Sequence, residues 1–136
     1  MRLLLNLAAS AALLIGATTA QAGCMRCDPI LNIVDAPVTS PMGKPMTEEQ
    51  VKEAIVRAGA ALGWQVKEDG PGKMIGLLLI RKHTAEISIV YSPTSYSLTY
   101  KSSINLDEGG GQIHKNYNGW IQNLNKGIAT QLKLES

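Results

Sequence analysis

The sequence lacks both a long basic stripe and a second long apolar run. Its 13 lysine and arginine residues are spread over 136 residues, whereas proteins that follow nucleic-acid phosphates gather such residues on one surface. Beyond the N-terminal segment, no apolar run reaches the roughly 20 residues that a membrane-spanning helix needs. The composition therefore argues against a nucleic-acid partner and against a transmembrane protein.

Recognisable catalytic motifs are also missing. The chain has neither a Gly-x-Ser-x-Gly elbow nor a His-Glu-x-x-His pair, the motifs that mark common serine hydrolases and zinc peptidases. It has only two histidines, His83 and His114. His83 is expected in a solvated turn between strands. We expect a non-enzymatic protein without a cofactor.

The N-terminus has the pattern of an export signal. Arg2 is followed by an apolar stretch over 3–17, and Ala20-Gln21-Ala22 is an Ala-x-Ala cleavage pattern. Removal of 1–22 leaves 114 residues, enough for one modest core, with 12 basic and 11 acidic residues. The predicted mature protein is periplasmic and nearly neutral.

The only two cysteines, Cys24 and Cys27, leave several interpretations open. In an oxidising compartment such a pair commonly forms a disulfide. Alternatively, Cys24 is lipidated and anchors the protein to a membrane, although Gln21 stands where a lipidation motif normally has leucine. A third possibility is copper binding by both thiolates and Met25, with other methionines, because Cu(I) prefers soft sulfur ligands. A redox role is disfavoured, because thioredoxin-like pairs lie at a strand-to-helix turn.

A helix is predicted over 48–62. Thr47 and Gln50 form a capping box, in which each side chain binds the other residue's backbone amide. Gly63 is suited to end the helix. One apolar stripe recurs at helical spacing: Val51, Ala54, Ile55, Ala58 and Leu62.

Five further segments read as strands. An apolar, β-branched stretch at 30–34 predicts an edge strand, and residues 64–68, 73–81, 84–91 and 96–101 predict an antiparallel meander because their connections are short. Apolar residues on both faces of 73–81 indicate a strand that is central or covered on both sides.

A final helix over 115–132 completes the domain, since an apolar stripe runs along it. The predicted order is strand, helix, four strands, helix. The fold class is therefore α+β: a two-layer sandwich, with a four- to five-stranded antiparallel meander sheet and two helices on one face. Residues 23–46 form an N-terminal segment, and 47–133 form a single domain.

The start of the final helix holds the candidate binding residues. His114, Asn116, Tyr117, Asn118 and Trp120 combine aromatic rings with amide groups, a combination that recurs at recognition sites. The structural alternative is that the two aromatic residues pack against the sheet while the asparagines cap the helix. His114 could also serve a catalytic role with a carboxylate of Asp107-Glu108.

The chain resembles a family of small exported proteins of Gram-negative bacteria, many with features of lipoproteins. The resemblance rests on Thr47-Glu48-Glu49-Gln50-Val51, Ala61-Leu62-Gly63-Trp64, Pro71-Gly72 and Ile113-His114-x-Asn116-Tyr117-Asn118-x-Trp120. It covers about residues 44–130, and it implies an envelope location and a compact α+β domain. It implies no reaction.

The leading functional hypothesis is a non-enzymatic envelope protein that binds a partner protein or a small ligand, or supports envelope integrity. Copper handling and an envelope enzyme that uses His114 are the alternatives. We expect a monomer or a weak homodimer, with membrane contact only through a lipid on Cys24.

Overall fold

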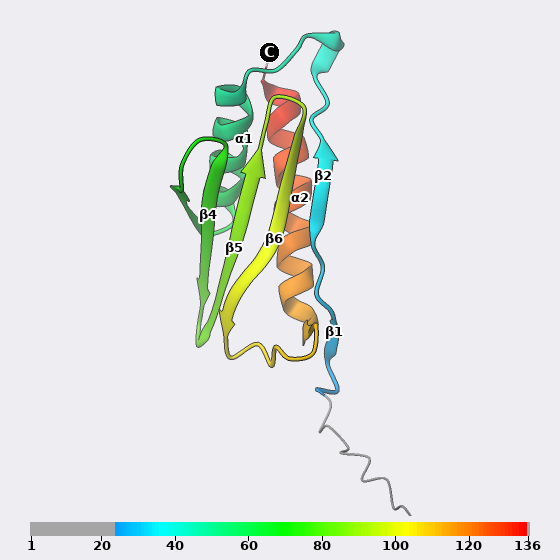
Figure 1. The fold of residues 1–136 in the computed structure, drawn as a ribbon, viewed down its shortest axis with the longest axis vertical. Coiled ribbons are helices and arrows are strands. Elements are labelled where there is room, and N and C mark those ends of the chain that lie inside the picture. The colour runs from blue at the N-terminus through cyan, green and yellow to red at the C-terminus, as the bar shows by residue number, and fades with distance from the viewer. Residues whose placement is uncertain (1–23, 136) are drawn as a thin grey trace, which may run out of the picture.

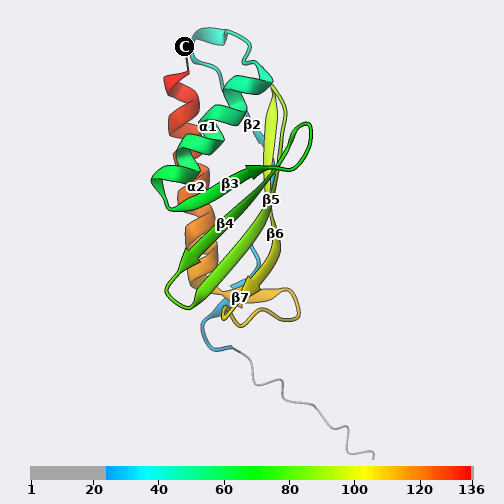
Figure 2. The same cartoon turned by 90° about the vertical axis from the view of Figure 1, so that its left-hand side faces the viewer.

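The computed structural model describes residues 24–135, so the predicted signal peptide, 1–22, lies outside the described residues. A five-stranded antiparallel sheet forms one layer, in the order β2-β6-β5-β4-β3. Two helices form the second layer, and both lie on the same face of the sheet (Figures 1 and 2). The predicted α+β fold class is confirmed.

The meander is built from four consecutive strands. They are β3 (Trp64–Glu68), β4 (Lys73–Ile80), β5 (His83–Tyr91) and β6 (Ser95–Ile104). Each pairs antiparallel with the next, as the short connections predicted. The bounds of β3 are as predicted, while β6 continues to residue 104 through polar residues that show no clean alternation.

The predicted first strand lies further along the chain than expected. The edge strand β2 spans Ile33–Pro37 and pairs with β6, whereas residues 30–34 were predicted. Ile30 and Leu31 pack against the core without joining the sheet. Their apolar character therefore reflects burial rather than strand pairing, and the sequence alone does not separate the two.

A second, two-stranded sheet was not predicted. β1 (Cys27–Pro29) pairs antiparallel with β7 (Gln112–His114). This sheet joins the N-terminal segment to the start of the last helix at one end of the molecule (Figure 2). Strands of three residues show no alternation that a sequence pattern could reveal.

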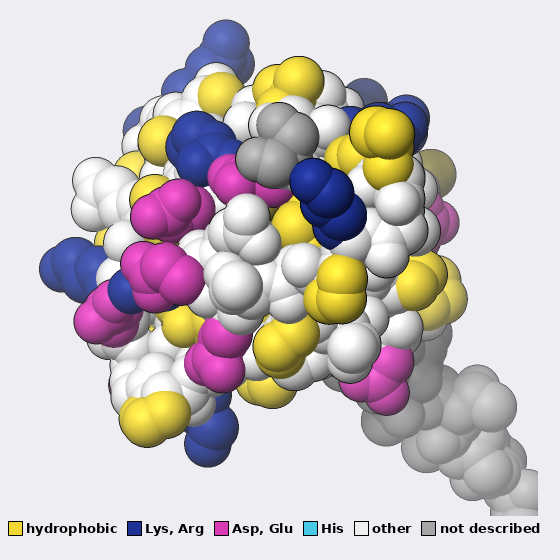
Figure 3. Space-filling model, turned by 90° about the horizontal axis from the view of Figure 1, so that it is seen from above, with side chains coloured by type: hydrophobic (Ala, Val, Ile, Leu, Met, Phe, Trp, Pro, Cys, Tyr) yellow, Lys and Arg dark blue, Asp and Glu magenta, His cyan; other side chains and the backbone are white. Residues whose placement is uncertain are grey.

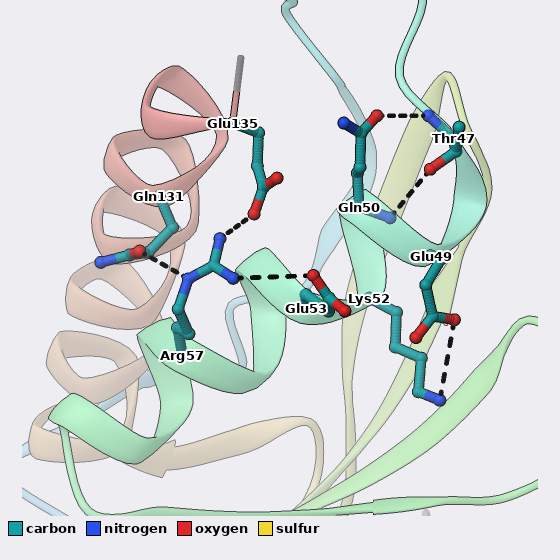
Figure 4. A network of polar contacts seen from close by, with 8 residues as sticks. All are labelled: Thr47, Glu49, Gln50, Lys52, Glu53, Arg57, Gln131 and Glu135. Carbon is teal, nitrogen blue, oxygen red and sulfur yellow. Dashed lines mark hydrogen bonds and ion pairs between the residues drawn. The ribbon is translucent and has the colours of Figure 1, made fainter.

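The first helix, α1 (Glu48–Ala61), begins at the predicted capping box. The Thr47 hydroxyl accepts from the Gln50 amide at 3.1 Å, and the Gln50 side chain accepts from the Thr47 amide at 2.9 Å (Figure 4). Gly63 has a φ of 87°, a left-handed conformation that glycine adopts readily just after a helix. Both predicted ends of the helix are thus confirmed to within one residue.

The second helix, α2 (Lys115–Leu134), packs its apolar stripe into the core. One set of its side chains is buried: Tyr117, Ile121, Leu124, Ile128 and Leu132. Where the helices meet, Gly127 faces Ala58 of α1, so that a methyl group at Gly127 would lie 3.5 Å from the Ala58 Cβ. Packing of this stripe offsets the roughly 1 kcal/mol that each internal glycine costs a helix.

A polar cluster at Arg57 joins α1 to the end of α2 (Figure 4). The Arg57 Nε donates to Gln131 Oε1 at 3.0 Å, and its guanidinium also pairs with Glu135. On its own helix it lies 3.9 Å from Glu53. Arg57 thereby adds polar contacts between the two helices to the apolar packing between them.

The opposite face of the sheet is uncovered in the part of the chain that the structure describes. Met74, Gly76 and Leu78 of β4 point into the core, whereas Ile75 and Leu77 on the outer face are only half-buried. Leu79, also on the outer face, is 56% exposed. β4 is central, as predicted, but covered on one side only.

Charged side chains of both signs lie at the end of the molecule where α1 begins and α2 ends. Figure 3 shows acidic side chains gathered on one side of this end, with lysine and arginine side chains around them. Glu48, Glu49, Glu68 and Lys52 line a shallow hollow of this surface, and Lys52 pairs with Glu68. No helix among the described residues is both long and apolar enough to cross a membrane.

Candidate functional site

His114 lies at the junction of β7 and α2, where it caps the helix. Its Nδ1 accepts from the backbone amide of Asn116 at 3.2 Å, so the ring proton of the neutral imidazole is on Nε2. Its own backbone amide donates to the Leu106 carbonyl at 2.8 Å. No hydrogen bond in the described part of the chain joins the His114 side chain to Asp107 or Glu108. The side chain therefore has a structural task at the helix start.

Asn118 fastens the N-terminal segment to α2. Its Oδ1 accepts from the Leu31 amide, and its Nδ2 donates to the Pro29 carbonyl, both at 2.9 Å. The side-chain amide of Asn118 thus binds both a backbone donor, the Leu31 amide, and a backbone acceptor, the Pro29 carbonyl, at the end of β1. Both polar groups of the Asn118 side chain are hydrogen-bonded within the protein. Asn118 therefore holds the local structure together rather than offering hydrogen bonds to a ligand.

Tyr117 is the most deeply placed of the predicted residues. Its side chain is fully buried, and its ring meets that of Tyr100 edge-on at a centroid distance of 5.7 Å. Its hydroxyl is buried without a hydrogen-bond partner. Burial, with a smaller contribution from Tyr100, raises the pKa of Tyr117 above its ordinary value. Tyr117 therefore belongs to the core and offers nothing to a ligand at the surface.

Replacing Tyr117 by Phe is expected to raise the unfolding free energy by about 1 kcal/mol, because a buried hydroxyl without a partner is costly. In the wild type, the raised pKa of Tyr117 favours the neutral phenol in the folded state. The stability linked to this group is therefore fully present in the wild type below about pH 10, and it is lost as the pH rises through the folded-state pKa. The variant should therefore unfold at higher pH than the wild type in alkaline titrations followed by circular dichroism.

The matched control is Tyr96→Phe. The Tyr96 hydroxyl donates to Asn125 Oδ1, so its loss should lower the unfolding free energy by about 1 kcal/mol. Opposite signs for these two equal deletions would identify the unpartnered hydroxyl as the cause. Equal destabilisation by both would contradict the prediction.

Asn116, Asn118 and Trp120 line one shallow hollow of about 450 Å³ on the outer surface of α2. The remaining lining comes from Asp28, Lys115, Gly119, Gln122 and Asn123. The structure thus brings together three of the five predicted binding residues, and leaves Tyr117 and His114 outside. Gln122 could have been identified from the sequence as a candidate lining residue, since it lies off the apolar stripe. Asp28 could not, because only the β1–β7 pairing brings it near α2.

Trp120 forms the apolar part of this hollow. It is half-buried and packs against the core, and its ring lies 6.4 Å from that of His83 between centroids. His83 in turn holds the Asn105 carbonyl at 2.7 Å through Nδ1, which must therefore carry the ring proton. His83 is thus an anchored, half-buried residue rather than the solvated turn histidine predicted from the sequence.

The cysteine pair forms a disulfide in this structure, the first of the alternatives considered above. Cys24 and Cys27 are half-buried, and the carboxylate of Asp107 lies beside them. Met25, by contrast, is fully exposed, and Met74 is buried in the core.

No family model, curated protein or solved structure matches this chain. The resemblance to small exported proteins stays a prediction.

Proposed function

We propose that this protein is a non-enzymatic binding module of the cell envelope, and that the hollow on α2 binds a neutral oligosaccharide. The observation that carries the proposal is the composition of the lining: one tryptophan beside four side-chain amides. The predicted export signal supports the envelope location, and glycans are common in envelope compartments.

Three of the four amides are available to a ligand. Asn116, Gln122 and Asn123 are exposed, and their side chains make no hydrogen bond within the described residues. Each offers two N–H donors and one carbonyl acceptor, which suits the paired hydroxyls of a sugar ring. Trp120 adds a flat apolar surface against which the C–H face of a sugar can pack.

The charge of the hollow favours a neutral ligand. Lys115 and Asp28 are its only charged lining residues, and their formal charges cancel. Asp28 is also its only carboxylate, whereas glycoside hydrolysis generally uses a pair of carboxylates on either side of the bond. This supports binding without cleavage.

Trp120→Ala is expected to weaken oligosaccharide binding about fivefold or more, because aromatic contacts of this kind contribute roughly 1 kcal/mol or more. Asn123→Ala should weaken it severalfold, since a neutral hydrogen bond contributes about 1 kcal/mol. Binding of neutral tetrasaccharides would be measured by calorimetry and by tryptophan fluorescence. The only other tryptophan, Trp64, is 4% exposed and should not respond.

Gln65→Ala provides the matched control, because Gln65 is an exposed amide on β3, outside the hollow. It should bind as the wild type does. Trp120→Phe should keep the fold and part of the affinity. If the wild type gives no saturable signal with any tetrasaccharide of a broad neutral panel, the proposal fails.

A further inference from the structure

Three potential metal ligands meet at the end of the molecule where β1 and β7 pair. One ligand atom from each of Cys24, Cys27 and Asp107 lies within 4.8 Å of the others. The Cys24 Sγ is 3.8 Å from the Asp107 Oδ2, although 83 residues separate the two in sequence. The Cys27 Sγ lies 3.8 Å from the Asp107 carbonyl oxygen. In the disulfide neither sulfur carries a proton, so these are contacts rather than hydrogen bonds.

Backbone contacts hold both halves of this group in place independently of the disulfide. Cys27 pairs with His114 across the small sheet, and the Lys115 amide donates to the Arg26 carbonyl at 2.8 Å. Asp107 follows the buried Leu106, whose carbonyl accepts from the His114 amide at 2.8 Å. Cys27 and Leu106, the residue before Asp107, therefore both contact His114 of β7 through the backbone.

We propose that the reduced protein binds one zinc ion through the thiolates of Cys24 and Cys27 and the carboxylate of Asp107, with water as the fourth ligand. Zinc binds thiolate sulfur at about 2.3 Å and carboxylate oxygen at about 2.0–2.2 Å with tetrahedral geometry. Ligand atoms around such an ion lie roughly 3.5 Å apart, which the 3.8 Å between Cys24 Sγ and Asp107 Oδ2 approaches.

The donor set selects zinc rather than copper. Two soft thiolates with one hard carboxylate suit a borderline ion, whereas Cu(I) prefers sulfur ligands throughout. Met25, the nearest thioether in the sequence, is fully exposed. Half-buried cysteines and an exposed carboxylate also leave the site open to an ion and its water.

Zinc binding in this site is coupled to the redox state of the cysteines. A dithiol reductant transfers two electrons and two protons to the Cys24–Cys27 disulfide, giving two thiols while the reductant becomes a disulfide. Zinc then binds the two thiolates and releases two protons. Oxidation removes both anionic ligands, so the disulfide form does not hold the ion.

The test uses the purified protein, reduced and freed of reductant under anaerobic conditions, then titrated with Co²⁺ as a spectroscopic probe and with Zn²⁺. The reduced wild type should bind one equivalent of Co²⁺, give thiolate-to-cobalt charge-transfer absorption in the near ultraviolet, and lose the cobalt to Zn²⁺. The oxidised protein should show none of this. Cys24→Ser/Cys27→Ser should abolish binding.

Asp107→Asn tests the third ligand. Asp107 has a φ of 53°, and asparagine tolerates this left-handed region, so the turn should survive. Zinc affinity is expected to fall at least tenfold. Asp107→Gly, which removes the side chain altogether and tolerates the same backbone conformation, should show the same loss. Glu108→Gln removes the neighbouring carboxylate, which lies outside the group, and should leave affinity unchanged.

Three results would overturn the site: no stoichiometric binding by the reduced wild type, equal binding by the oxidised protein, or wild-type affinity in both Asp107 variants. A lipid on Cys24, visible in the intact mass of the natural mature protein, would overturn it as well.

The site is separate from the hollow on α2. Trp120→Ala should therefore bind zinc normally, and Asp107→Asn should bind oligosaccharide normally.

Discussion

Leu78→Ala is expected to lower the unfolding free energy by about 2–5 kcal/mol, whereas Leu79→Ala should change it by less than about 0.5 kcal/mol. The two leucines are neighbours on β4, and the two substitutions remove the same atoms. Leu78 is 3% exposed and faces the helices, while Leu79 is 56% exposed on the outer face. The difference arises because only the first deletion leaves a cavity in a packed core.

Urea unfolding followed by circular dichroism measures both values. The comparison also tests whether the outer face of the sheet is covered by anything in solution. If Leu79→Ala costs as much as Leu78→Ala, the outer face of the sheet is packed against a further layer, and the sheet is not covered on one side only.

Asn118→Ala is expected to cost about 1–3 kcal/mol, since it removes two hydrogen bonds and leaves the partly buried Leu31 amide and the exposed Pro29 carbonyl without their protein partner. The effect should be local. Hydrogen exchange of the Leu31 amide should accelerate, because its acceptor is lost, while amides in β4 and β5 keep their protection.

Two variants give this experiment its controls. Asn116→Ala removes an exposed asparagine two residues earlier and should change stability by less than about 0.5 kcal/mol. Asn118→Asp keeps an acceptor for the Leu31 amide but loses the donor to Pro29, so it should lie between the wild type and Asn118→Ala. Unchanged exchange at Leu31 in Asn118→Ala would contradict the role assigned to this side chain.

The candidate site could be located from the sequence only in part. The helical stripe correctly indicated that Tyr117 packs inward with Ile121 and Leu124. It could not show that the amide of Asn118 reaches the backbone of residues 29–31, because that contact spans 87 residues. For the same reason Asp28 and Asp107 gained their significance only once the chain was folded.

The sequence by itself determined the α+β fold class, both helices, the four-stranded meander and the capping box. These depend on local periodicity and on contacts between neighbours in the chain, which the order of residues records directly. The tertiary structure decided the rest: the short β1–β7 sheet, the shifted edge strand, the uncovered face of β4, and the meeting of Cys24, Cys27 and Asp107. Those features depend on contacts between distant residues, whose cost in chain entropy is offset only by the packing of the whole domain.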